Sequence, residues 1–239
     1  MDITAEQRKK MKSLGFLSNK DGQHFSARVL TRNGVLNSRQ LRNVSEAAEK
    51  FGNGNVSFTS RQTVEIPGIK FEDVENFQKH IEKENMTTGG TGPKVRPIVA
   101  CKGTVCIYGL IDTQALALEI HKRFYEGYHD VSLPHKFKIA VGGCPNNCVK
   151  PDLNDVGIIG NKDSSGEIKN KMYIGGRWGK QTRHGSLLSK SLTREEALDI
   201  LEKAILLFKA KGQPGERFTS MIDRMGVAEI EKMLFSDPS

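Results

Sequence analysis

The 239-residue sequence contains no long apolar run and no recognisable leader segment. No stretch approaches the roughly 20 apolar residues that a membrane-spanning helix requires. Residues 1–12 mix acidic and basic side chains and lack the apolar centre of a secretory signal. We therefore expect a soluble, cytoplasmic protein without a membrane partner, in which thiols stay reduced and act as ligands more often than as disulfides.

Signatures of several other protein classes are absent as well. No low-complexity tract or short repeat is present, which excludes a solenoid. The glycines between residues 89 and 92 neither follow a strand nor open a helix, so they do not form a flavin or nicotinamide fingerprint. Aromatic residues make up 7% of the chain, and the expected strands lack the interleaved aromatic side chains that stack bases. We expect no nucleic-acid partner.

Positive charge is abundant by contrast, with a formal net charge of +8. The excess is concentrated in residues 28–61 and 167–194, where basic side chains greatly outnumber acidic ones. Such a field attracts an anion, which could be a cofactor, a substrate, an acidic protein or a nucleic acid. The charge alone does not choose among them.

Hydrophobic periodicity predicts a β-α-β-α order in the first part of the chain. We expect strands at 24–31 and 56–67, a helix with Ser38 as its N-cap that ends at the glycines from 52 onward, and a second helix over 71–81. This order fits a small sheet covered on one face by helices. Residues 87–93 hold three glycines and predict a flexible joint.

The joint divides the expected α+β fold into a domain at 1–88, which includes an N-terminal helix, and a domain at 89–239. In the second domain we expect strands at 97–100, 136–141, 156–159 and 171–174. Asp112 is the expected cap of one helix, and Thr193 with Glu196 forms a capping-box pattern at the start of a longer one.

All four cysteines fall in two close pairs, Cys101 with Cys106 and Cys144 with Cys148. Four thiolates in two short turns suit a soft metal centre. Zinc is a rival, although its ligand pairs usually sit in small knuckles with shorter spacing, whereas each pair here follows an expected strand. A further alternative is that the cysteines are ordinary small core residues.

A resemblance to a known family separates these alternatives. The segment 133–148, which reads LPHKFKIAVGGCPNNC, resembles the signature of the sulfite and nitrite reductase family, whose members bind sirohaem and a 4Fe-4S cluster. Residues 59–63 resemble the strand of that family that contacts sirohaem. Residues 34–36 and 215–218 match two further family stretches, so that the likeness extends over nearly the whole chain from about residue 14.

The resemblance implies a ferredoxin-like half-domain followed by an α/β domain that binds sirohaem and the 4Fe-4S cluster. It implies that all four cysteines ligate the cluster and that Cys148 also bridges to the sirohaem iron. Thr59, Arg61, Gln62 and Thr63 would contact the cofactor. Sirohaem carries eight carboxylates, and the many basic side chains of the chain would bind them.

The implied activity is the reduction of a small oxyanion, sulfite to sulfide, with electrons from a separate and acidic donor such as ferredoxin. The implied substrate cations are Lys136, Lys138, Arg96 and Arg28, whereas we leave His135 outside the site. Larger family members contain two copies of this unit and this chain contains one, so we expect a homodimer.

Two departures from the family pattern leave alternatives open. The first cysteine pair is one residue closer than expected in the larger enzymes. Leu30 stands where an arginine is expected, so that either Arg28 or Arg32 would replace it, or the substrate site carries less positive charge. Ammonia-forming nitrite reduction uses the same cofactors and is the alternative activity. A non-catalytic electron carrier or tetrapyrrole-handling protein is the other alternative.

Overall fold

A computed structural model describes residues 3–236, and contacts divide the chain into two compact units, Met1–Gly92 and Pro93–Ser239. The sequence placed the boundary between residues 88 and 89. Residues 89–92 belong to the first unit, where Thr88 forms a bridge with Val29 and the Gly89 amide donates to the Arg28 carbonyl at 3.1 Å. None of the helices within residues 3–236 combines the length and apolar character that a bilayer crossing requires.

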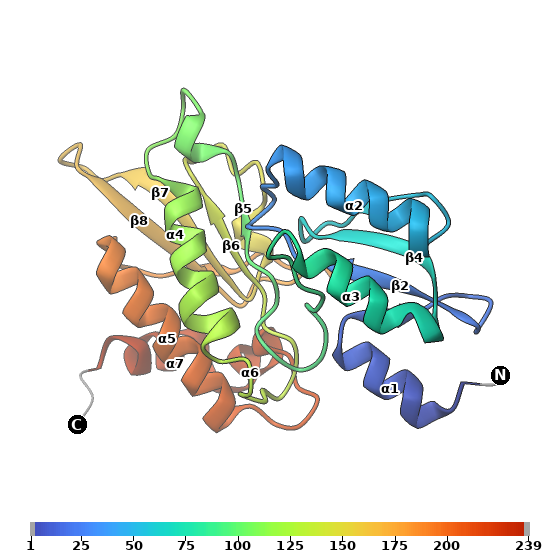
Figure 1. The fold of residues 1–239 in the computed structure, drawn as a ribbon. Helices are drawn as coiled ribbons and strands as arrows, with labels where there is room; N and C mark the ends of the chain where they lie inside the picture. Colours follow the sequence, from blue (N-terminus) through green and yellow to red (C-terminus); the bar gives the residue numbers. More distant parts are fainter. Residues whose placement is uncertain (1–2, 237–239) are drawn as a thin grey trace. The chain divides into compact units, whose positions relative to one another are not determined.

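The first unit is an antiparallel four-stranded sheet with helices α2 and α3 packed together and α2 packed on strand β4 (Figure 1). The strand order is β1-β2-β4-β3. The elements in chain order are α1 (Ala5–Ser13), β1 (Phe16–Ser18), β2 (His24–Val29), α2 (Ser38–Phe51), β3 (Ser57–Phe58), β4 (Val64–Lys70), the 3-10 turn η1 (Phe71–Asp73) and α3 (Val74–Glu82).

The continuous strand expected over 56–67 is wrong, because residues 59–63 form the turn of a hairpin between β3 and β4. Gln62 has a left-handed backbone, with φ of 58°, which reverses the chain. The Thr59 hydroxyl accepts the amide hydrogen of Thr63 at 3.2 Å and closes the turn. Apolar alternation on both sides of the turn hid it from the sequence pattern.

The helix caps follow local hydrogen-bond chemistry. Asn37 caps α2 instead of Ser38, because its side chain accepts the Gln40 amide hydrogen while the Gln40 side chain accepts the Asn37 amide hydrogen. The expected caps at Asp112 and Thr193 are confirmed, the second with its full capping box to Glu196.

The second unit is a five-stranded mixed sheet in the order β5-β6-β7-β8-β9. The first three strands are parallel and the last two pairings are antiparallel. The strands are β5 (Val99–Ala100), β6 (Ile139–Gly142), β7 (Val156–Lys162), β8 (Ile168–Ile174) and β9 (Ser186–Leu187).

Helices α4 and α5 pack on this sheet, α4 on β5 and β6 and α5 on β8 (Figure 1). Phe124 lies in a π-helical turn that extends α4 and is buried there. The remaining elements are η2 (Gly103–Val105), α4 (Thr113–Ile120), η3 (His121–Glu126), η4 (Pro151–Leu153), α5 (Arg194–Lys211), α6 (Phe218–Met225) and α7 (Val227–Phe235).

Three phenylalanines join the sheet of the second unit to its C-terminal helices. Phe137 precedes β6, Phe208 lies on α5 and Phe218 opens α6, and all three are fully buried. Their ring centroids lie 5.1 to 5.8 Å apart. Aromatic pairs at this distance add to the stabilisation from buried area.

We predict that Phe208→Ala lowers the free energy of unfolding of the second unit by about 3–5 kcal/mol, because it removes a fully buried ring and leaves a cavity. Leu206→Ala on the same helix is the matched control, since Leu206 is 45% exposed, and it should cost about 1 kcal/mol or less. Urea unfolding followed by circular dichroism measures both. Equal losses would contradict the packing described here.

Candidate metal and anion site

The two cysteine pairs are brought together by the parallel pairing of β5 and β6. Val99 is opposite Ala140 and Ala100 is opposite Val141. The Cys101 amide continues this ladder by donating to the Val141 carbonyl at 3.1 Å. Because parallel strands end at the same edge of a sheet, the turn that follows β5 and the turn that follows β6 start side by side.

Contacts between the two turns are direct. The Gly143 amide donates to the Cys101 Sγ at 3.2 Å, and the Leu110 amide donates to the Gly143 carbonyl at 2.8 Å. A Cβ on Gly143 would lie 2.9 Å from the Cα of Gly103, so a side chain there would force the turns apart. The glycines beside the cysteines are therefore required by close backbone approach.

Helix α4 begins beside the first cysteine turn. The Thr113 hydroxyl and the Gln114 side chain both donate to the Cys101 carbonyl, at 2.7 and 3.2 Å. Asp112 caps the helix and accepts the Thr104 hydroxyl from the same turn. A helix N-terminus carries a partial positive charge, which suits a site that holds an anionic group.

The donor set fits an iron–sulfur cluster. Cys101, Cys106 and Cys144 are partly buried, and Cys148 is exposed at the end of the second turn. Among residues 3–236, no three His, Cys, Asp or Glu side chains are grouped so that they could hold one metal ion. A 4Fe-4S cluster makes a different demand, because each thiolate binds its own iron. The amide donated to Cys101 Sγ and the glycine approach suit such a cluster.

Three predicted substrate cations lie before these strands. Val95 forms a parallel bridge with Phe137, and both side chains are buried. Because side chains alternate along extended chain, Arg96 on one segment and Lys136 and Lys138 on the other lie away from that core. The structure thus brings these three together, at the opposite end of β6 from Cys144.

A buried ion pair fixes this cationic segment. Asp155 is fully buried and its two carboxylate oxygens accept from Arg217 Nη2, each at 3.1 Å. The same carboxylate accepts the Lys138 amide hydrogen at 2.8 Å. Burial raises the pKa of Asp155, and the Arg217 charge and the Lys138 amide oppose that rise.

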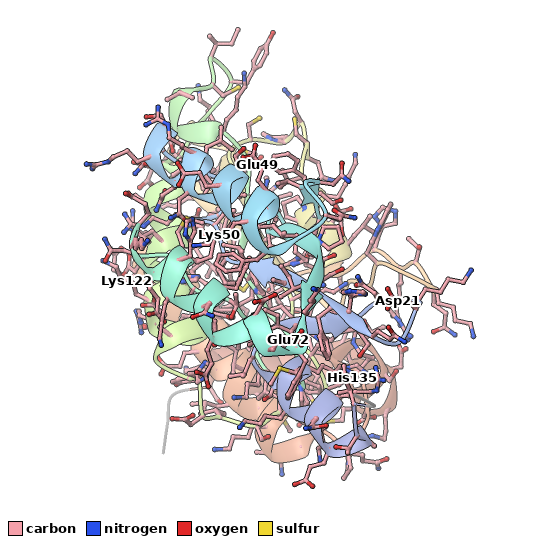
Figure 2. All side chains as sticks on the ribbon, turned by 45° about the vertical axis from the view of Figure 1, so that its right-hand side comes forward. Asp21, Glu49, Lys50, Glu72, Lys122 and His135 are labelled. Carbon is pink, nitrogen blue, oxygen red and sulfur yellow. The ribbon has the colours of Figure 1, made fainter. Side chains whose placement is uncertain are left out.

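Neighbouring arginines complete a cationic cluster around Lys136. Burial lowers the pKa of Lys136, and the charges of Arg217, Arg96 and Arg177 lower it further. His135, labelled in Figure 2, has a lowered pKa for the same reasons, first burial and then the charge of Arg217. Sequence reasoning gave no role to Arg177 or Arg217, although Arg177 lies in the basic stretch and Arg217 in a matched family segment.

The predicted cofactor residues of the first unit all lie in the hairpin turn at 59–63. Thr59 and Thr63 join their hydroxyls at 2.7 Å, and the Thr31 hydroxyl donates to the Gln62 carbonyl. Arg61 is partly buried. The turn is therefore a compact element that presents Arg61 and Gln62 at its tip.

Arg28 is engaged within the first unit. Its guanidinium donates to Glu65 at 2.5 and 2.9 Å and to the Gly90 carbonyl at 3.1 Å. The Glu65 carboxylate offsets its charge. Arg32, the other candidate for the cation expected at Leu30, is exposed in the turn that follows β2.

Comparison with known proteins gives two family matches. The nitrite and sulphite reductase 4Fe-4S domain matches residues 91–237. The nitrite/sulfite reductase ferredoxin-like half domain matches residues 18–84. Together they span most of the chain and correspond to its two units.

Curated relatives are reductases of both kinds. A nitrite reductase [NAD(P)H] of Bacillus subtilis is 31% identical over 207 residues, which are 86% of this chain and 24% of that protein. The coenzyme F420-dependent sulfite reductase of Methanocaldococcus jannaschii is 36% identical over 143 residues, 59% of this chain and 22% of that protein. The chain thus spans less than a quarter of the length of both.

Two solved structures extend the comparison. NirA of Mycobacterium tuberculosis has a TM-score of 0.85 at 19% identity, and the match covers 97% of this chain and 46% of that one. Dissimilatory sulfite reductase I has a TM-score of 0.77 at 15% identity, with coverage of 90% and 70%. The structures confirm the predicted α+β fold class.

We predict that Asp155→Ala lowers the free energy of unfolding by about 3–5 kcal/mol, because it leaves the buried Arg217 charge without a partner. Asp223→Ala is the control, since it removes an exposed pair with Arg183, and should cost less than about 1 kcal/mol. Denaturant unfolding measures both. The account of Asp155 fails if the two variants lose the same amount.

We also predict that Lys136→Met raises the pKa of His135, because it removes a neighbouring positive charge. Lys122→Met, on the π-helical turn, should leave the pKa of His135 unchanged; Lys122 and His135 are labelled in Figure 2. An NMR titration of the histidine ring protons gives the answer. No difference between the two variants would show that Lys136 does not act on His135.

Proposed function

The chain belongs to the nitrite and sulphite reductase family, and we propose that it reduces sulfite to sulfide with a 4Fe-4S cluster and sirohaem. The observation that supports this most is the meeting of the two cysteine turns at the ends of β5 and β6. In this proposal Cys101, Cys106, Cys144 and Cys148 hold the cluster. The bound groups would store electrons and pass them singly to the substrate.

The residues around Lys136 support an anion site. The charges of Arg96 and Arg177 act on Lys136, and Lys138, whose Nζ donates to the Trp178 carbonyl beside Arg177 at 3.4 Å, adds a further cation where carboxylates of a macrocycle or an oxyanion would be bound. A lysine with a lowered pKa releases its proton more readily, so Lys136 can supply protons as water leaves the substrate. Lys138 is held in place through its amide by Asp155.

Residues of the first unit complete the proposal. Thr59, Arg61, Gln62 and Thr63 would contact the macrocycle from the hairpin turn. Arg28 remains the proposed substrate cation of β2, although Glu65 offsets its charge. Arg32 can take its place because it is exposed.

The proposed site includes a second copy of the chain. Lys138 lies before β6 and Cys144 after it, and six residues of extended strand span roughly 20 Å. The second unit therefore places Lys136 and Lys138 at one end of β6 and the Cys144 and Cys148 thiols at the other. A homodimer in which one copy brings its lysines to the cysteine turn of the other closes that distance.

The electron donor is proposed to be a separate acidic protein such as a ferredoxin. The net charge of +8 favours association with an acidic surface. A rate that falls as salt rises would follow from such steering.

Turnover with a reduced dye as donor tests the proposal. We expect the anaerobically purified protein to reduce sulfite, and Lys136→Met and Cys148→Ser each to lose at least about 100-fold in kcat, because a charge-stabilising or ligating group is removed. Lys122→Met is the control and should keep full activity. If the protein turns over nitrite but not sulfite, the proposed substrate is wrong and nitrite takes its place. If it turns over neither, the proposal that the protein is an enzyme is overturned.

Mixing the two inactive variants tests the shared site. In a heterodimer one composite site carries both substitutions and the other carries neither, so random pairing should restore about a quarter of the wild-type rate. If each chain builds its own site, mixtures of Lys136→Met and Cys148→Ser stay inactive.

A further inference from the structure

The second cysteine turn has an unusual backbone on both sides of Cys148. Asn147 has φ of 54° and Lys150 has φ of 50°, both in the left-handed region. The Asn147 amide donates to the Cys144 carbonyl at 3.3 Å, and the Lys150 amide donates to the Asn147 carbonyl at 3.0 Å. Such conformations cost energy for residues other than glycine and persist where neighbouring groups hold them.

Asp152 supplies such a hold. Its Oδ1 accepts a hydrogen bond from the Asn147 side-chain amide at 2.7 Å, and its Oδ2 lies 2.5 Å from His184 Nδ1. The Asp152 side chain is 10% exposed, whereas that of His184 is 75% exposed. Burial alone would raise the pKa of Asp152, but the bonds from Asn147 and His184 outweigh burial and keep it below its ordinary value. The carboxylate is thus charged and directed at the turn.

The backbone of Asp152 is itself anchored to the loop between β8 and β9. The Gly185 amide donates to the Asp152 carbonyl at 2.7 Å. A Cβ on Gly176 would lie 2.2 Å from the same carbonyl oxygen, so the loop packs on it backbone to backbone. Within this loop the backbone amides of Arg177 and Arg183 each donate to the carbonyl of the other at 2.8 Å. The loop that contacts Asp152 is therefore itself fixed by hydrogen bonds.

We propose that Asp152 is a positioning residue for the cysteine turn: its carboxylate holds Asn147, and through Asn147 the direction of the Cys148 thiol, against the anchored 175–185 loop. The inference rests on the proposed function, because it concerns the cluster that Cys148 would bind. It assigns Asp152 no contact with substrate. Outer partners of this kind orient metal ligands, and their loss typically lowers metal affinity by about 10- to 100-fold.

Competition with an iron chelator under anaerobic conditions tests the role of Asp152. We expect Asp152→Ala to lose its cluster absorbance about 10- to 100-fold faster than the wild type, and its cluster reduction potential, followed by EPR, to shift. Asp152→Asn keeps an acceptor oxygen for Asn147 and should lie between the two. Asp163→Ala is the matched control, because Asp163 holds an exposed turn of the same unit through Ser165 and Glu167.

The possible outcomes separate the two proposals. A wild-type protein that holds no cluster overturns the proposed function and this inference with it. A wild type that holds the cluster, together with an Asp152→Ala variant that matches it in both chelator rate and potential, overturns the inference alone. Should Asp152→Ala fail to fold, Asp152→Asn decides: the inference stands if its cluster is lost faster than that of Asp163→Ala, and fails if the rates agree.

Discussion

The parallel pairing of β5 with β6 is the constraint on which the site depends. Each strand runs directly into a cysteine turn, and the ladder between them continues to the Cys101 amide. The pairing therefore sets the distance between the turns before any metal binds. The glycine contact between Gly103 and Gly143 and the hydrogen bond to Cys101 Sγ refine that distance. A shift of one residue in the pairing would turn the first pair of thiols to the other face of the sheet.

The same strand separates two kinds of chemistry. Its carboxyl end leads to the sulfur atoms of Cys144 and Cys148, and its amino end leads to the cations around Lys136. Asp155 and Arg217 hold the cationic end, and Asp152 lies beside the thiolate end, so one short segment of chain supports both. The dimer is proposed because of this separation: in the proposed function, the anion site and the cluster would have to approach each other for electrons to reach the substrate.

Much of this arrangement was predictable from sequence because it depends on local patterns. The cysteine spacing and the family segment around it indicated a candidate metal site, and the Thr193 capping box correctly marked the start of α5. The hairpin at 59–63 was missed because apolar residues alternate on both sides of the turn, and the turn itself depends on the left-handed Gln62 and the Thr59 hydroxyl. The Asp155–Arg217 pair joins residues 62 positions apart, and no local pattern reports such a contact.

The helices at the end of the chain also depend on tertiary packing and not on a local pattern. The second domain's C-terminal helices α6 and α7 were not expected, since each is short and is held by packing, with Phe218 and Leu234 fully buried. The roles of Arg177 and Arg217 likewise depend on the loop and helix that carry them to Lys136.

Metal and sulfide analysis of the anaerobically purified protein, combined with EPR, tests the central claim most directly. The account predicts about four iron atoms and four acid-labile sulfides per chain for the cluster, one further iron in sirohaem, and an EPR signal that shows the two centres coupled. A colourless protein that holds zinc in place of iron and sulfide would contradict it.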